Sequence, residues 1–267
     1  MPSEKTPNRY SQLLEAIFFK HYLPGLKEIT FDRAEINQIA DDLGIKPPKN
    51  LGDVLYSFRY RTPLPQSIQE VAPENHEWII RPAGRSKYIF VLVSHSIITP
   101  SALMVETKIL DATPGVISKY SMNDEQSLLA KIRYNRLIDI FTGLTCYSLQ
   151  NHLRTTLKDG SQIETDEIYI GIDKRGVHYI LPIQAKGRKD KIGIVQIEQD
   201  FVMTGEKFPS LLCRSIAAQL LENDLIAMFE FEETENGIKV SAEKHYRLVN
   251  TEELSLEELA AYRLRQN

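Results

Sequence analysis

The residues of this sequence that could do chemistry gather at the end of one predicted strand. The run HYILPIQAK, residues 178–186, begins as a buried-looking strand but ends in Gln184 and Lys186, which strand formation does not require. Side chains at i and i+2 of a strand lie on the same face, so these two should project together. The preceding predicted strand, 163–172, carries Asp166 near its start. We therefore expect a carboxylate, an amide and an ammonium group at one sheet edge.

The turn between these two strands predicts how they pair. It centres on 174–176, so antiparallel pairing matches position n with about 350 − n, and Asp166 falls near Gln184. The Asp166 carboxylate and the Gln184 carbonyl are hard oxygen ligands suited to Mg²⁺, with Mn²⁺ as a substitute. The Lys186 ammonium can orient or help deprotonate a metal-bound water and offset charge on a phosphate. The predicted chemistry is phosphodiester hydrolysis.

Two further acids are candidates for the same site. Glu125, on a long predicted helix at 122–141, could add a water-mediated metal contact. Glu164 is an alternative metal ligand, because it lies two residues before Asp166 and therefore on the same face of the strand. A plainer interpretation stays open for each residue. Asp166 could merely begin a strand, Gln184 and Lys186 could be a polar strand end, and the two glutamates could be solvated.

An aspartate followed 18 residues later by Gln-x-Lys on the next strand resembles the PD-(D/E)XK nuclease superfamily, the fold of most type II restriction endonucleases. The glutamine form is similar to that of Mrr-like restriction nucleases. The resemblance covers about residues 120–250, and Thr165 stands where the family has proline. It implies an α/β domain with a mixed sheet flanked by helices.

The resemblance also implies roles for individual residues. Asp166 and Gln184 would be metal ligands, Lys186 the catalytic lysine and Glu125 the helix acid of a Mg²⁺-dependent endonuclease. Gln196, on the helix predicted after the motif, matches a polar position of Gln-x-Lys enzymes. The alternative for Gln196 is a plain amide on a helix surface.

The first part of the chain has a different pattern. Helical patterns at 11–20, 30–44 and 51–61 precede two predicted strands at 76–82 and 87–93. Three short helices and a basic hairpin follow the order of a small α+β winged helix-turn-helix domain, which binds DNA with one helix and its wing. A domain that only packs or contacts proteins is the alternative. The predicted DNA-binding residues are Lys49, Arg59, Arg61, Arg85, Lys87 and, after the Gln-x-Lys motif, Arg188.

These patterns predict a winged-helix-like domain at 1–95, a linker at 96–119 and a nuclease-like domain at 120–267. In the last part we expect the helix at 122–141, then three strands, two helices, a strand pair and a C-terminal helix. The predicted strands are 146–157, 163–172, 177–186, 226–233 and 238–249, and the predicted helices are 192–201, 209–224 and 255–266.

The composition fits a globular protein, with 42% hydrophobic and 25% charged residues and a net charge of −4. Residues 46–87 carry seven basic and four acidic side chains, whereas residues 220–260 carry three basic and eleven acidic ones. A locally basic stretch suits contact with a polyanion, although ordinary solvated surface is the alternative. Without an apolar leader or an apolar run of about 18 residues, we expect a cytoplasmic protein without a membrane span.

Other catalytic classes find no support in the sequence. Two cysteines, Cys146 and Cys213, are too few for a disulfide framework or a zinc site, and no nucleotide-binding or serine-hydrolase motif is present. His178 and His245 lack a nucleophile at a recognisable spacing, so we expect plain strand histidines.

The sequence therefore predicts a restriction or defence endonuclease that acts on double-stranded DNA as a homodimer. A repair or branched-DNA nuclease is one alternative. A DNA-binding regulator with a catalytically silent nuclease-like domain is the other.

Overall fold

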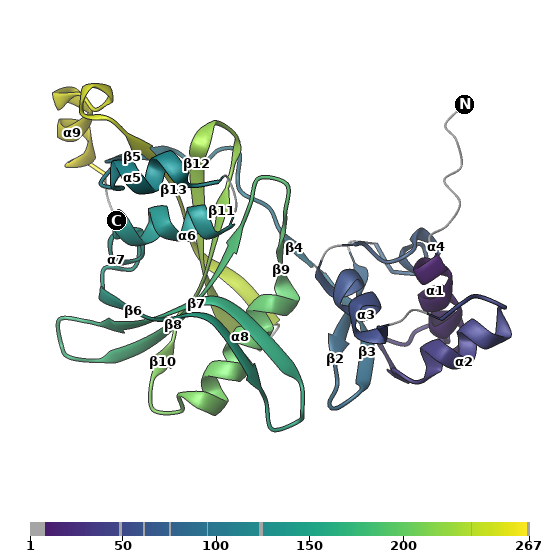
Figure 1. The fold of residues 1–267 in the computed structure, drawn as a ribbon. Helices are drawn as coiled ribbons and strands as arrows, with labels where there is room; N and C mark the ends of the chain where they lie inside the picture. The colour runs from purple at the N-terminus through teal and green to yellow at the C-terminus, as the bar shows by residue number, and fades with distance from the viewer. Residues whose placement is uncertain are drawn as a thin grey trace, which may run out of the picture. The chain divides into compact units, whose positions relative to one another are not determined.

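The computed structural model describes residues 9–47, 50–60, 62–74, 76–94, 96–122, 125–235 and 237–265 (Figure 1). The chain divides into two compact units. The first comprises Met1–Ile98, Thr156–Gln162 and Gly193–Val195, and the second Thr99–Thr155, Ile163–Ile192 and Gln196–Asn267. The second contains a large mixed sheet flanked by helices, which confirms the predicted α/β class.

The first unit combines short helices with a three-stranded antiparallel sheet in the order β1-β3-β2. Its elements are α1 (Arg9–His21), β1 (Glu28–Asp32), α2 (Glu35–Asp42), α3 (Leu51–Tyr60), α4 (Gln66–Gln69), β2 (Glu77–Pro82) and β3 (Lys87–Val93), followed by the short β4 (Ile97–Ile98). Within the stretch 30–44, residues 30–32 belong to β1 and the helix α2 follows, with the Asp32 N–H donating to Oε1 of Glu35 at 3.0 Å. Ile29 and Phe31 are buried between exposed neighbours, the period of two that a half-buried strand requires.

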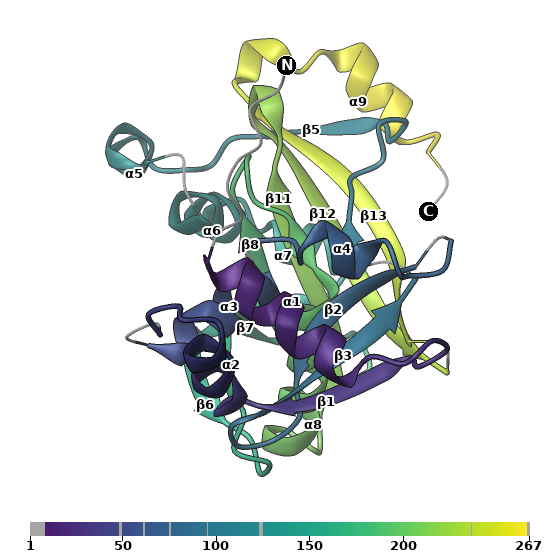
Figure 2. The same cartoon turned by 90° about the vertical axis from the view of Figure 1, so that its right-hand side faces the viewer.

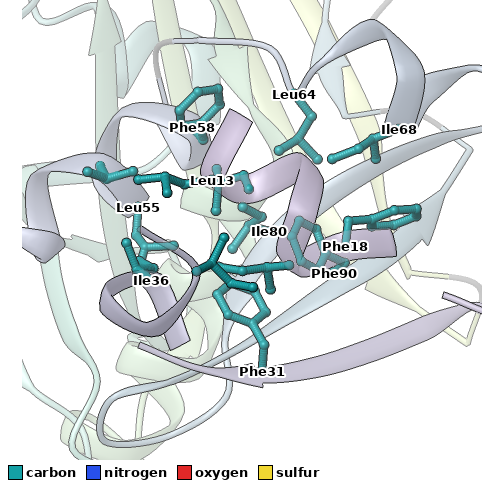
Figure 3. Packing of buried hydrophobic residues seen from close by; sticks show 14 of the residues in the cluster. Leu13, Phe18, Phe31, Ile36, Leu55, Phe58, Leu64, Ile68, Ile80 and Phe90 are labelled. Carbon is teal, nitrogen blue, oxygen red and sulfur yellow. The ribbon is translucent and has the colours of Figure 1, made fainter. Parts of the chain in front are cut away.

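One aromatic-rich core holds this unit together (Figure 3). Phe18 of α1 lies 5.2 Å from Phe90 of β3, and Phe90 stacks on Phe31 of β1 at 4.8 Å between ring centroids. Trp78, the single tryptophan of the chain, packs edge-on against Phe18 and is 1% exposed. Such pairs stabilise a core beyond the area they bury, by about 0.5–1.5 kcal/mol each.

Glu35 at the start of α2 gives this unit a pH-dependent stability. Burial would raise the pKa of its carboxyl, but hydrogen bonds from His21, Lys20 and the Asp32 amide outweigh burial and lower it to about 2. A lowered carboxyl pKa stabilises the folded state at high pH, and this contribution is lost as pH falls from about 4.5 to about 2.

Glu35→Gln should therefore lower the free energy of unfolding at neutral pH by about 1 kcal/mol. Urea unfolding measures the difference when it is followed by the fluorescence of Trp78, which lies in the hydrophobic core of the first unit. The gap from the parental protein should close as the pH approaches 2. A gap that is the same at neutral and acidic pH would contradict the assignment.

The second unit is built on an eight-stranded sheet in the order β5-β13-β12-β11-β8-β7-β6, with β10 also paired to β8. Its strands are β5 (Glu106–Leu110), β6 (Thr145–Thr156), β7 (Gln162–Ile172), β8 (His178–Lys186), β10 (Leu212–Cys213), β11 (Ser215–Leu220), β12 (Leu225–Thr234) and β13 (Gly237–Val249), and the short β9 is Ile192–Gly193. Its helices are α5 (Gly115–Tyr120), α6 (Glu125–Tyr134), α7 (Leu137–Thr142), α8 (Ile194–Lys207) and α9 (Leu256–Tyr262), with 3-10 turns at Glu222–Asp224 and Thr251–Glu253.

One predicted helix was wrong, and another is divided in two. The stretch 209–224 forms β10 and β11 instead, and every residue of β11 is buried between β8 and β12. A strand buried on both faces is apolar throughout, so periodicity does not distinguish it from a buried helix. The stretch 122–141 contains two helices, α6 and α7, separated at Arg136, whose left-handed φ of 51° ends regular helical geometry.

The predicted linker 96–119 contains an edge strand of the large sheet. In this stretch, β5 pairs in parallel with β13, from Glu106↔His245 to Leu110↔Val249 (Figure 2). Arg247 of β13 also binds the Glu106 carboxylate with its Nη2 at 2.7 Å.

Helices cover both faces of the sheet around β8 (Figure 1). Ile183 and Ala185 of β8 belong to a buried cluster with Leu128 and Ile132 of α6. Gln184, which points to the opposite face, hydrogen-bonds a side chain of α8. The alternation along β8 thus places its polar end between α6 and α8.

Candidate active site

The pairing of β7 with β8 brings the predicted site residues together. The two strands pair from Ile172↔His178 to Glu167↔Ile183, which is the register predicted from the sequence. Just beyond the paired region, Oδ2 of Asp166 accepts a hydrogen bond of 2.8 Å from the backbone N–H of Ala185. Asp166 is therefore fixed beside the Gln184–Lys186 segment.

Lys186 lies between this strand end and the start of α6. Its side chain is almost buried, and its Nζ lies 3.4 Å from Oε1 of Glu125. Burial raises the pKa of Glu125, the positive charge of Lys186 opposes that shift, and the negative charge of Asp166 adds to it. The three charged groups therefore share one electrostatic environment.

Helix α6 is held against β7 by an ion pair next to the site, between a buried glutamate and a partly exposed arginine. The fully buried Glu167 accepts hydrogen bonds from Arg133 of α6, at 3.0 Å from Nε and 2.8 Å from Nη2, and another from Ser148 of β6. Glu167 belongs to the acidic start of β7, but its contacts are structural. By fixing α6, this ion pair positions Glu125.

Gln184 is bound by a carboxylate that the sequence analysis missed. Its Nε2 donates to Oδ2 of Asp200 on α8 at 3.0 Å, and the Thr165 hydroxyl donates to Oδ1 of Asp200 at 2.6 Å. All three side chains are buried. Burial raises the pKa of the Asp200 carboxyl to about 7. The hydrogen bonds from Thr165 and Gln184 act in the opposite direction and lower this pKa.

A sequence signal for Asp200 existed. Ile197, Asp200 and Thr204 are buried and recur at the i, i+3 and i+7 spacing of one helix face. An aspartate on the inward face of an amphipathic helix requires a buried partner, because an unpaired buried charge is costly. The partner could not be identified without the tertiary structure.

The other candidate acid and amide lie apart from this cluster. Glu164 forms ion pairs with Arg154 at 3.1 Å and His152 at 3.7 Å. Gln196 is half-exposed on α8, and among the described residues no hydrogen bond ties it to Asp166, Gln184 or Lys186.

The structure also shows the surroundings of the two histidines and two cysteines considered in the sequence analysis. His178 and His245 lie in strands, and burial raises the pKa of the Cys146 and Cys213 thiols to about 11 and 12.

The residues predicted to bind DNA have varied surroundings. Arg85 and Lys87 are exposed around the turn between β2 and β3. Arg59 of α3 is half-buried, with its guanidinium 4.7 Å from the Tyr60 ring centroid, and Arg188 forms an ion pair with Asp224. The remaining two, Lys49 and Arg61, lie outside the described residues.

The cluster has the donor set of a site for a hard cation. Oε1 of Gln184 is buried and has no hydrogen-bond partner among the described residues, a property that it shares with Oε1 of Gln219 and Oε2 of Glu167. Such an oxygen can accept from a ligand. No described group of three or more His, Cys, Asp or Glu side chains could hold a metal alone. Asp166 binds the backbone of the residue that follows Gln184, so its carboxylate and the Gln184 amide oxygen fit the donor types of one Mg²⁺ ligand set completed by water or substrate oxygens.

Comparison of the chain with protein-family models, curated proteins and solved structures finds no match. Within the part of the chain that the structure describes, no helix is long and apolar enough to cross a membrane. The arrangement of Asp166, Gln184, Lys186 and Glu125 is thus the main feature that bears on function.

Proposed function

We propose that this protein is a metal-dependent DNA endonuclease with Asp166, Gln184, Lys186 and Glu125 in its active site. The observation that carries the proposal is the buried, unpartnered Oε1 of Gln184, next to an aspartate and a nearly buried lysine. An unmet acceptor of this kind costs about 1–3 kcal/mol, so it suggests a ligand. The restriction-endonuclease-like fold of the second unit is part of this proposal.

Each side chain would have a distinct role. Asp166 and the Gln184 carbonyl would hold Mg²⁺, which would supply Lewis-acid activation of water and offset charge on the phosphate. The Lys186 ammonium would orient the attacking water and stabilise negative charge as the phosphodiester bond breaks. Glu125 would hold Lys186 in position.

The first unit would bind duplex DNA as a winged helix. The order α1-β1-α2-α3-α4-β2-β3 and the exposed Arg85 and Lys87 around the β2–β3 turn support this proposal. Helix α3 would enter the major groove, and the turn would contact the neighbouring backbone.

Replacing Arg85 and Lys87 together with alanine should weaken duplex binding and make it less dependent on salt. Each lost phosphate contact lowers the slope of log affinity against log salt by about 0.9. Fluorescence titration of a labelled duplex, on a Lys186→Ala background that leaves it uncut, measures the slope. Lys239 and Lys244, exposed lysines of β13, provide a matched control pair. An unchanged slope would exclude a DNA-binding role for the hairpin.

Plasmid cleavage with and without Mg²⁺ tests the proposed activity. Discrete fragments that require Mg²⁺ are expected from a restriction or defence enzyme, and two copies related by a two-fold axis would cut both strands. Nicking only at junctions would indicate a repair or branched-DNA nuclease. Duplex binding without cleavage would indicate a regulator and contradict the proposal.

A further inference from the structure

The structure places the NH₂ group of Gln184, not its carbonyl oxygen, against Asp200. In this orientation both carboxylate oxygens of Asp200 accept hydrogen bonds. Oδ1 of Asp200 accepts from Thr165, so Oδ2 is left to the NH₂ group of Gln184. The carbonyl oxygen of Gln184 must then face away from Asp200, and it is the atom left without a partner.

The burial of this pair makes the orientation strict. Thr165 and Asp200 are 0% exposed and Gln184 is 1% exposed. Water therefore cannot readily replace a lost partner, and a reversed amide would lose the hydrogen bond from its Nε2 to Asp200. In this environment an unmade hydrogen bond is costly.

The same contact bears on which residue can stand at position 184. A glutamate there would bring a second carboxylate to the position where the Gln184 amide now lies 3.0 Å from Asp200. Two buried carboxylates at that distance do not both ionise. The carboxyl group at this position thus belongs to Asp200 of α8, behind the residue that faces the site.

We propose that Asp200 is a positioning residue, which holds the Gln184 carbonyl toward the metal and makes glutamine the functional residue at 184. This inference rests on the proposed metal-dependent function. It assigns a role to Asp200 that is separate from ligation, because both of its carboxylate oxygens already accept hydrogen bonds within the protein.

Exchanging the two side-chain types provides the test. In Gln184→Glu, two acceptors face each other. In Asp200→Asn, with the Asn carbonyl on the Thr165 hydroxyl, the Asn NH₂ group faces the Gln184 amide and turns its carbonyl away from the metal. In the Gln184→Glu/Asp200→Asn double variant, the Asn NH₂ group donates to one Glu oxygen and leaves the other for the metal. Donors and acceptors match again.

Binding of Mn²⁺ in the absence of DNA is the readout, because electron paramagnetic resonance measures the free ion directly. Each single variant should bind Mn²⁺ about 10- to 100-fold more weakly, the usual effect of losing a ligand's hydrogen-bonding partner. The double variant should recover most of that loss. Gln150→Glu, the same change at an exposed position of β6, should bind like the parental protein.

The outcomes separate this inference from the proposed function. Circular dichroism and urea unfolding without metal establish that each variant is folded. If Asp166→Asn abolishes Mn²⁺ binding but the double variant is no better than the weaker single variant, the metal site stands and the role of Asp200 is wrong. Parental affinity in Asp200→Leu, which offers the Gln184 NH₂ group no acceptor, would also overturn it. If the parental protein binds no Mn²⁺, the proposed function and the inference both fail.

Discussion

Lys186→Ala should lower the rate of single-turnover DNA cleavage by at least about 10²- to 10³-fold, the usual cost of losing one preorganised electrostatic contact in an active site. The Lys186 side chain is almost buried and lies 3.4 Å from Glu125, so neither water nor a neighbouring lysine can take its place. DNA affinity should change little, because most phosphate contacts would lie elsewhere.

Lys174→Ala is the matched control for Lys186→Ala. Lys174 is exposed in the turn at the opposite end of the β7–β8 hairpin. Its replacement removes the same charge without touching the site, so cleavage should stay at the parental rate. Glu125→Ala should have a milder effect than Lys186→Ala, because Glu125 acts through the lysine. Parental cleavage by a folded Lys186→Ala variant would refute its catalytic role.

Asp166→Asn should lower Mg²⁺-dependent cleavage by at least about 10³-fold. A metal ion contributes several kcal/mol to the transition state, and about 1.4 kcal/mol corresponds to a tenfold change in rate. Asparagine keeps an oxygen that can accept the hydrogen bond from the Ala185 N–H, so the strand contact survives while the negative charge is lost. Single-turnover cleavage across a Mg²⁺ series measures both the rate and the metal requirement.

Asp166→Ala separates the structural contact of Asp166 from its charge. Alanine leaves the Ala185 N–H without its partner, so this variant should also be less stable than Asp166→Asn, by about 1–3 kcal/mol. Urea unfolding followed by circular dichroism measures the difference. If both variants cleave DNA at the parental rate and with the parental Mg²⁺ dependence, the site is not at this sheet edge.

The register of β7 with β8 followed from the sequence because it depends on local information. A turn at 174–176 between two adjacent apolar runs defines one pairing, and a slip by one residue would move every side chain to the other face. That register placed Asp166 beside Gln184. The approach of Glu125 to Lys186 was only a hypothesis, because it depends on how α6 packs on the sheet.

Other elements were misread where local pattern and tertiary environment disagree. The apolar run in β11 reads equally as a buried helix, and its place between β8 and β12 decides that it is a strand. Arg136 takes a left-handed conformation that divides α6 from α7, although the helical pattern of the sequence continues through it.

The sequence by itself determined the residue types of the candidate site and the hairpin that carries three of them. Only the tertiary structure placed Asp200 against Gln184, because these residues lie on different elements and meet through the packing of α8 on the sheet. Spacing along a chain predicts neighbours within a strand pair. Contacts between a helix and a sheet depend on packing across a shared core, which no local pattern encodes.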